Sequence, residues 1–490
     1  MADLSVPSVV PNWIAGTERP ALSGLTFEKF NPTNGRPLCR VARSSGDDIN
    51  EAVLSAKSVQ PEWASETVVR RGEILRATAG LLEKHQKEIA DLVSLETGKS
   101  RKDALGETGA AIEMGFFVAG EGRRFYGKTT TSGVPGRSAM IIRQPLGVAG
   151  LIIAANTPIA NVAWKVFPAL LCGNAAVLKA SEDSPLSAWA FGRLLEEAGA
   201  PVGVLQIVHG HGPEAGGPLV DHNDVPIVSF TGSCSVGRWI AERAGRRLAK
   251  VCLELGGKNP LIVCDDADLE RAVQVSVASA FSNAGQRCAS GSRLIVYDEV
   301  FDHFRELLVN ATKTLRIGPD DNDDLGPVIN DEQLNNMISA VEQARSSGAV
   351  VVAGGGRLKG ERHKDGYYMA PTIIDNVGPD DDISMTELFG PIVCLYRVKD
   401  FEEAVSLANS SPFGLTASIH TANIDRAMTF IGRVQSGVAV VNGATYGSEP
   451  HMPFGGLKQS GNGTREAGTE AIDVYSELKT VYIHHDESRV

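Results

Sequence analysis

The chain has 490 residues, which is too long for one ordinary hydrophobic core and predicts two or more domains. Hydrophobic residues make up 43% and charged residues 22%, a balance typical of a soluble globular protein. The net charge of −12 argues against nucleic-acid and anionic-membrane partners, since both favour a basic surface, but it leaves an anionic small substrate open.

The N-terminal segment and the cysteines indicate the compartment. MADLSVPSVVPNWIAG has no basic region followed by a long apolar run, and the chain has no uninterrupted apolar run of bilayer length, so we expect neither a secretory signal nor a membrane span. The seven cysteines are odd in number and widely spaced, with no C-x-x-C. This pattern favours reduced thiols in the cytoplasm over a disulfide framework or structural zinc, and we predict no metal site.

The first part of the chain predicts helices and then a β arm. Residues 46–119 repeat apolar positions at three- and four-residue steps, and Gly98 closes one such run. GKTTTSGVPGRSAMIIRQPLG follows and is rich in Thr and Gly with a short apolar run. It predicts an exposed β arm.

Two alternating series of strands and helices follow. GVAGLII, NAAVLKA, GVLQIVHG, PIVSFTG and KVCLEL are short apolar strands with helical runs between some of them, so residues 147–264 predict a parallel sheet. A second series, over residues 260–437, includes NPLIVC, SRLIVYD, AVVVAGG, IVCLYRV and SGVAVVN. We therefore expect an α/β protein with two sheets, a cleft between them, and a terminal strand (residues 474–484) able to pair with another subunit.

One cysteine stands in a distinctive setting. In FSNAGQRCAS, Cys288 follows Arg287, and no Cys or His stands close by in sequence, which argues against metal ligation. A free thiol has a pKa of about 8.5 and needs help to act at neutral pH, which Arg287 and nearby backbone amides offer. Most free cysteines are small buried core residues, so Cys288 is interpreted either as a nucleophile or as a core residue.

Two further residues are candidates for catalysis. Glu254 lies in the apolar run LELGGK, where burial raises the pKa of a carboxyl group and suits a general base, although a structural glutamate bonded to backbone N–H groups is an equal alternative. Asn156 in AANTPIAN offers an amide for an oxyanion, or forms an Asx turn ahead of Pro158.

Two motifs indicate a nucleotide-binding site, although each is weak by itself. In IVSFTGSCSVGRWIAERAG, Gly232 and Ser233 join a strand to a helix whose first N–H groups suit a diphosphate, or simply form a helix cap. In VLKASED, Lys179 and Glu182 follow a strand end, where a carboxylate can accept ribose hydroxyls and repels a 2′-phosphate, or forms a solvated loop.

Together, in their order and spacing, these motifs resemble the aldehyde dehydrogenase superfamily. They are NTP at Asn156, FTGS, LELGGK, GQRC with Cys288 34 residues after Glu254, ELFGPI and PFGGLKQSG. The resemblance extends from NPTNG at Asn31 to the terminal strand. It implies an α/β fold with a variant Rossmann NAD-binding domain (residues 1–126 and 146–255), an α/β catalytic domain (256–460) and an oligomerisation arm (127–145 and 472–490), assembled as a homodimer or homotetramer.

The resemblance also implies catalytic roles. Cys288 is the nucleophile, and the Asn156 amide together with the Cys288 backbone N–H stabilises the oxyanion. Glu254 activates the water that hydrolyses a Cys288 thioester, and Lys165 in AWKVFPAL supports the site. A distal glutamate on a proton path falls on Glu466, for which a solvated helix-end residue is the alternative.

Cofactor contacts carry over in the same way. Glu182 favours NAD, with NADP as the alternative. The implied cofactor-binding residues are Ile152, Lys179, Glu182, Gly212, Phe230, Gly232, Ser233, Leu255, Glu387 and Phe389.

The substrate is the least determined feature. HMPFGGLKQSGNGTREAGTEA and NTPIANVAWKVFPALLCGN are most similar to bacterial semialdehyde dehydrogenases, including the α-ketoglutaric semialdehyde group, which implies a small aldehyde with a distant carboxylate. Ala155 and Thr157 stand where many relatives have aromatic residues, so the substrate tunnel is expected to differ in shape. Alternatives are a CoA-acylating enzyme, an aromatic aldehyde dehydrogenase, or a binding protein that kept the fold without the chemistry. Candidate partners for a substrate anion are Arg287, Arg123, Arg124 and His451.

Overall fold

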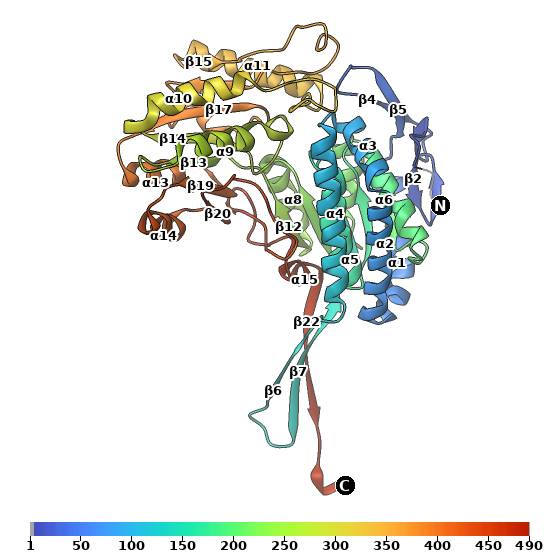
Figure 1. The fold of residues 1–490 in the computed structure, drawn as a ribbon. Helices are drawn as coiled ribbons and strands as arrows, with labels where there is room; N and C mark the ends of the chain where they lie inside the picture. Colours follow the sequence, from blue (N-terminus) through green and yellow to red (C-terminus); the bar gives the residue numbers. More distant parts are fainter. Residues whose placement is uncertain (1–3, 490) are drawn as a thin grey trace.

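The computed structural model of the chain describes residues 4–489 and contains two seven-stranded sheets with a narrow arm below them (Figure 1). Five strands of the first sheet are parallel, and a short hairpin (β2 and β3) extends it antiparallel to β10. In spatial order the strands are β12 (Lys250–Glu254), β11 (Ile227–Thr231), β8 (Val148–Ile152), β9 (Ala175–Lys179), β10 (Leu205–Val208), β2 (Asn12–Ile14) and β3 (Thr17–Arg19). The predicted parallel sheet is confirmed.

Helices pack against this sheet because its central strands are apolar on both faces; β8 and β9 are buried along their whole length. Gly98 ends α3 in the left-handed conformation, with φ of +76°, as its position in the sequence predicts. The helices of this part are α1 (Gly46–Ser65), α2 (Val68–Lys84), α3 (Gln86–Thr97), α4 (Arg101–Glu121), α5 (Pro158–Leu171), α6 (Pro185–Glu197), α7 (Gly217–Asp221) and α8 (Cys234–Arg246).

The second sheet is parallel except at one edge, where β15 runs antiparallel to β16. Its order is β15 (Val350–Ala353), β16 (Thr372–Asp375), β17 (Ile392–Val398), β14 (Gly291–Tyr297), β13 (Asn259–Val263), β19 (Thr416–His420) and β20 (Val438–Val441). The helices of this part are α9 (Leu269–Phe281), α10 (Asp298–Lys313), α11 (Asp331–Ser346), α12 (Asp382–Met385), α13 (Phe401–Asn409) and α14 (Ile424–Arg433).

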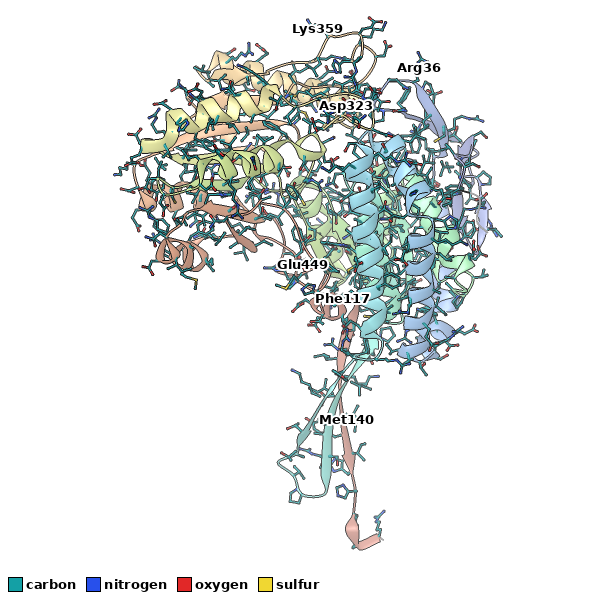
Figure 2. All side chains as sticks on the ribbon, in the orientation of Figure 1. Arg36, Phe117, Met140, Asp323, Lys359 and Glu449 are labelled. Atoms are coloured by element: carbon teal, nitrogen blue, oxygen red, sulfur yellow. The ribbon has the colours of Figure 1, made fainter. Side chains whose placement is uncertain are left out.

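The arm projects away from both sheets, and Met140 marks it in Figure 2. It consists of β6 (Lys128–Thr131), β7 (Arg137–Pro145) and β22 (Ser476–His484), and the short α15 (Glu470–Tyr475) leads into β22. The predicted exposed β arm is confirmed. The terminal strand pairs with β7 of its own chain over its whole length, so one of its edges is satisfied without another subunit.

Two small sheets complete the secondary structure. They are formed by β1 (Val9–Val10), β5 (Pro37–Ala42) and β4 (Thr26–Phe30), and by β18 (Phe413–Gly414) and β21 (Leu457–Lys458). Within residues 4–489, none of the helices combines the length and apolar composition needed to cross a bilayer.

Candidate active site

Cys288 lies in a strained loop between α9 and β14. A 3₁₀ turn (Ser282–Gly285) precedes it, in which Asn283 and Ala284 are left-handed, with φ of +53° and +52°. Non-glycine residues avoid this conformation, so the surrounding contacts must hold the loop in place. One of them comes from β13: Asn259 Nδ2 donates to the Cys288 carbonyl oxygen at 2.8 Å.

The Cys288 thiol is half-buried and free. Burial raises its pKa to about 12, and the carboxyl groups of Glu387 and Glu254 act in the same direction. The opposing effects of the Ala289 N–H and of Arg287 are smaller. Arg287 therefore does not offset the effect of burial on the pKa of the thiol.

Glu254 ends β12 and is only 5% exposed. Neither of its carboxylate oxygens has a hydrogen-bond partner among the described residues. Burial raises its pKa well above the usual range, Glu466 adds to the effect, and Lys165 and Arg465 oppose it. The alternative of a structural glutamate satisfied by backbone N–H groups is therefore wrong, and the carboxyl group has the environment of a general base.

The glycine pair after Glu254 lets three segments meet. A Cβ atom on Gly256 would overlap the Glu387 carboxylate, and one on Gly257 would lie 2.5 Å from the Cys288 carbonyl oxygen. Gly257 N also donates to Glu387 Oε1 at 2.9 Å. Only residues without a side chain allow the Cys288 loop and the Glu387 loop to approach the end of β12 so closely.

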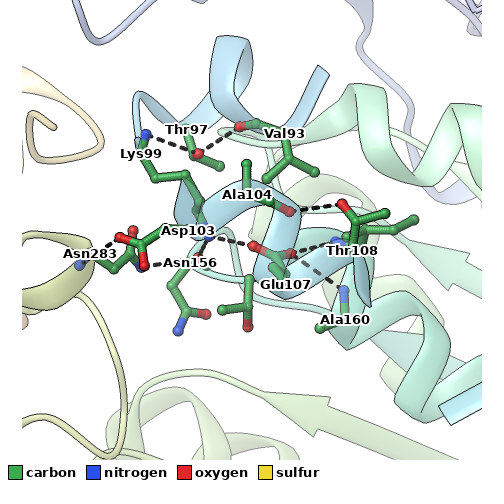
Figure 3. Close-up of polar contacts among 12 residues, drawn as sticks. Val93, Thr97, Lys99, Asp103, Ala104, Glu107, Thr108, Asn156, Ala160 and Asn283 are labelled. Carbon is green, nitrogen blue, oxygen red and sulfur yellow. Dashed lines mark hydrogen bonds and ion pairs between the residues drawn. The ribbon is translucent and has the colours of Figure 1, made fainter. Parts of the chain in front are cut away.

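Asn156 follows β8 and leads into α5. Its backbone oxygen accepts hydrogen bonds from Lys99 Nζ at 2.6 Å and from Asn283 Nδ2 at 3.3 Å. Within residues 4–489 its side-chain amide forms no hydrogen bond, so the Asx turn ahead of Pro158 is absent. Since Asn283 belongs to the loop that carries Cys288, this hydrogen bond joins that loop to the segment that carries Asn156, and Figure 3 shows Asn283 beside Asn156.

Lys165 and Glu466 form a buried cluster beside Glu254. Lys165 Nζ forms an ion pair with Glu466 and donates to Ser229 Oγ at 2.8 Å, and Ser229 Oγ donates to Glu466 Oε1 at 2.9 Å. Glu466 is 2% exposed, so the interpretation of a solvated helix-end residue is wrong. Its charge contributes to the raised pKa of Glu254, which places the cluster next to the candidate base.

The residues predicted to contact the adenosine ribose lie at the carboxyl end of β9 in the first sheet. Lys179 Nζ pairs with Glu182 Oε2 at 2.8 Å. Burial works against ionisation of Glu182, but Lys179 outweighs it and holds the pKa of that carboxyl group below its usual range. Glu182 therefore carries a negative charge at neutral pH.

Ser233 is the N-cap of α8, and its Oγ accepts from Val236 N at 3.4 Å. Gly232 N donates to the Glu254 carbonyl oxygen at 3.1 Å, which connects the start of α8 to the end of β12. The remaining predicted contacts surround these elements. Ile152 and Phe230 are buried strand residues of the first sheet, Leu255 follows β12, and Gly212 begins a π-helical turn (Gly212–Gly216). Phe389 has a left-handed backbone, with φ of +54°, and lies two residues after Glu387. Burial raises the pKa of the Glu387 carboxyl group to about 7.

The candidate anion-binding residues differ in position. Arg287 forms an ion pair with Asp103 at 3.3 Å, and its guanidinium lies over the Tyr446 ring, 4.9 Å from the centroid. The other three lie outside the Cys288 loop and are exposed: Arg123, Arg124, which pairs with Glu121, and His451, 3.7 Å from Glu449. Among the described residues, none of these three has an ion pair with a group of the site.

Sequence reasoning missed the polar residues that support the two loops. Lys99, Asp103 and Glu107 contact the Asn156 and Cys288 loops, and Asn283 joins those loops to each other. The available signal was the four-residue spacing of Asp103 and Glu107 in a segment rich in small apolar residues, since this spacing places both on one helix face. The described residues contain no group of three or more His, Cys, Asp or Glu side chains that could hold a metal ion.

The comparisons with known proteins identify the family of the chain. The model of the aldehyde dehydrogenase family matches residues 20–481, so the chain belongs to this family and is an aldehyde-oxidising oxidoreductase. It is 38% identical over 475 residues to the α-ketoglutaric semialdehyde dehydrogenase of Bacillus subtilis, covering 96% of this chain and 97% of that protein. It is 36% identical to the α-ketoglutarate semialdehyde dehydrogenase of Haloferax volcanii, covering 96% and 98%.

Among solved structures, the betaine aldehyde dehydrogenase of Staphylococcus aureus in complex with NAD⁺ superposes with a TM-score of 0.95 and 32% identity, over 96% of this chain and 94% of that one. The predicted family, α/β fold and enzyme class are confirmed.

Proposed function

We propose that the protein oxidises a small anionic semialdehyde to its carboxylic acid with NAD, through covalent catalysis at Cys288. The observation that carries this proposal is the convergence of three groups. The Cys288 loop is hydrogen-bonded to Asn156 through Asn283, and the Glu254 carboxyl group, which has no hydrogen-bond partner among the described residues, contributes to the raised pKa of the Cys288 thiol.

In the first step Glu254, in its ionised form, takes the thiol proton, and the Cys288 thiolate forms a carbon–sulfur bond with the aldehyde carbon. The carbonyl electron pair moves to oxygen, where the Asn156 amide and the Cys288 N–H donate hydrogen bonds to it. The tetrahedral carbon then releases a hydride, for which NAD, when bound, supplies the acceptor. The product on the enzyme is a Cys288 thioester.

Before the second step Glu254 passes the thiol proton to the Lys165–Glu466–Ser229 cluster beside it. Glu254 then takes a proton from water, and the water oxygen forms a bond with the thioester carbon. The carbon–sulfur bond breaks, the carboxylic acid leaves, and the Cys288 thiolate takes the proton back from Glu254 to return to the thiol form.

The first sheet supplies groups that fit a dinucleotide. The N-terminus of α8 exposes backbone N–H groups and the Ser233 hydroxyl, which suit a diphosphate. Glu182 at the end of β9 suits ribose hydroxyls, and its negative charge repels a 2′-phosphate, which favours NAD over NADP. The S. aureus relative was crystallised with NAD⁺. We therefore assign dinucleotide binding to residues 1–126 and 146–255, and catalysis to residues 256–460.

The substrate class rests on the relatives. Two of them are named for α-ketoglutaric semialdehyde, an aldehyde that carries a carboxylate, and Arg287 is the one predicted cation that lies in the Cys288 loop. Its ion pair with Asp103 is long, and its Nε is buried without a partner among the described residues, so this guanidinium retains a donor for an anion.

The arm is proposed to join subunits into a homodimer or homotetramer. Its terminal strand has a free edge and carries exposed apolar side chains, Leu478, Tyr482 and Ile483. Sedimentation of the full chain and of a Leu478→Asp/Tyr482→Asp variant tests this assignment. We expect a dimer or tetramer that the variant dissociates; a monomeric wild type would contradict it.

The test of the proposed function is an aldehyde panel of semialdehydes and uncharged alkanals and aromatic aldehydes, with NAD and NADP in parallel. We expect NADH formation with the highest kcat/KM for a semialdehyde, and none with Cys288→Ala. Cys264→Ala, which removes a buried thiol in the second sheet, is the matched control. A preference for uncharged aldehydes would overturn the substrate class, and turnover by Cys288→Ala would overturn the mechanism.

A further inference from the structure

Three charged side chains on one side of the segment from residue 99 to residue 107 point toward the site (Figure 3). Lys99 precedes α4, and Asp103 and Glu107 lie one turn apart on it. Lys99 is 4% exposed and Glu107 is 8% exposed. Charges are rarely buried to this degree unless they are paired, so their partners define their role.

Lys99 and Glu107 hold the Asn156 loop at two points. Lys99 Nζ forms an ion pair with Glu107 and donates to the Asn156 carbonyl oxygen at 2.6 Å. The other carboxylate oxygen of Glu107 accepts from Ile159 N at 3.0 Å and from Ala160 N at 3.4 Å. These N–H groups open α5, whose own N-cap residue provides no side-chain hydrogen bond. Both ends of the segment that carries the Asn156 amide are therefore fixed to α4.

Asp103 holds the Cys288 loop from the same helix. Its Oδ2 accepts from Asn283 N at 3.3 Å, and its Oδ1 accepts from Arg287 Nη2 at 3.3 Å. Asn283 is one of the two left-handed residues, so its conformation persists only while such contacts hold it. Asn283 Nδ2 then reaches back to the Asn156 carbonyl oxygen, which closes the network.

From this geometry we propose that Lys99, Asp103 and Glu107 form a positioning scaffold that sets the separation between the Asn156 amide and Cys288. None of the three touches the reacting atoms in the proposed mechanism, on which this inference rests. Donors of an oxyanion hole act within a few tenths of an ångström of one geometry, and a buried ion pair on a rigid helix suits that requirement better than a surface loop does.

The decisive variant is Lys99→Met/Glu107→Gln. It removes both buried charges together, so neither is left unpaired, and the amide oxygen of the substituted glutamine still accepts from Ile159 N and Ala160 N. What it removes is the hydrogen bond to the Asn156 carbonyl oxygen. We expect kcat/KM for the aldehyde to fall about 10- to 100-fold, with the dissociation constant for NAD within about twofold of wild type.

A double-mutant cycle separates positioning through Asn156 from a general structural defect. In an Asn156→Ala background, Lys99→Met/Glu107→Gln should lower kcat/KM by less than about threefold, because the group that it positions is already gone. Thr108→Val is the matched control on the same helix, since its hydroxyl bonds only to Ala104 O, and it should leave kcat/KM unchanged. Equal losses in both backgrounds, or no loss in the wild-type background, would overturn the proposal.

A second measurement needs no turnover. Asp103→Leu removes the acceptor for Asn283 N, and amide hydrogen exchange in residues 282–289 should accelerate by about fivefold or more, while Thr108→Val should not change it. If residues 282–289 of Asp103→Leu exchanged at the wild-type rate, the proposed scaffold would be overturned, even if the variant were active. If the wild-type protein oxidised no aldehyde, the proposed function would fail, and the exchange experiment would still decide whether the scaffold exists.

Discussion

The Asn156 side and the Glu254 side of the site differ in whether their buried charged groups have partners. On the Asn156 side, Lys99 and Glu107 are paired with each other, and both have further hydrogen bonds to backbone groups. On the Glu254 side, a carboxyl group is buried with no hydrogen-bond partner among the described residues and with a raised pKa. The difference teaches that satisfied charges give position, whereas an unsatisfied carboxyl group gives reactivity.

This division also explains why Glu254 is stable in its setting. A buried carboxylate without partners is costly, and the group avoids most of that cost by holding a proton. In the proposed mechanism it becomes a base when it loses the proton to the adjacent Lys165–Glu466 cluster. The same proposal has the satisfied groups on the other side keep the oxyanion donor in place while this proton moves.

The largest effect is expected from substitution of Cys288. Cys288→Ala removes the nucleophile, so kcat/KM should fall by about 10⁴-fold or more. The measurement is NADH formation with the preferred aldehyde, with Cys264→Ala as the control that keeps activity. Substantial turnover by Cys288→Ala would contradict the assignment of Cys288 as the nucleophile. It would also remove the distinction between a reactive side and a positioning side of the site.

Glu254→Gln is expected to have the next largest effect. It keeps the size of the side chain but cannot accept a proton, so steady-state kcat should fall by about 10²- to 10⁴-fold. The comparison variant is Glu387→Gln, whose carboxyl group accepts from Gly257 N at 2.9 Å and is therefore already partnered. A larger loss of thioester hydrolysis in Glu387→Gln than in Glu254→Gln would contradict the assignment of Glu254 as the base.

The pH profile tests the coupling between Glu254 and Glu466. The Glu466 charge raises the pKa of Glu254, so Glu466→Gln should lower that pKa, and the now unpaired Lys165 lowers it further. Because the base must be ionised, the ascending limb of log kcat against pH should move to lower pH. A shift to higher pH would contradict the assignment of Glu254 as the base.

The smallest effect is expected at the adenosine end. Glu182→Gln removes the charge that repels a 2′-phosphate, so the ratio of kcat/KM with NADP to that with NAD should rise about 10-fold. Glu196→Gln, an exposed position on α6, is the control and should leave the ratio unchanged. An unchanged ratio in Glu182→Gln would place cofactor selectivity elsewhere.

Sequence reasoning proposed the candidate reactive groups but not the groups that hold their loops. Cys288, Glu254, Asn156 and Lys165 stand in ordered local motifs, and the strands of both sheets have strong apolar runs. The scaffold residues do not, because their partners are far along the chain. Asp103 contacts Asn283 across 180 positions, and Lys99 reaches Asn156 across 57. Only the fold brings such pairs together.

The role of Arg287 illustrates the same limit. Its position before Cys288 predicted an activator of the thiol, an anion partner or a packing residue, and the structure shows contacts with Asp103 and Tyr446. Its effect on the thiol pKa is smaller than that of burial. Likewise, the burial of Glu466 depends on α5 and β11, neither of which is near it in sequence.

The most direct test of a reactive, unpaired Glu254 is to follow Glu254→Gln through a single turnover. The variant should form NADH more slowly than wild type, because the Cys288 thiol has lost its base, and should stop after about one equivalent per active site. The acyl group should then be trapped on the Cys288 peptide, as detected by mass spectrometry. Continued wild-type turnover, or NADH formation without an acylated Cys288, would contradict the assignment of Glu254 as the base that activates water.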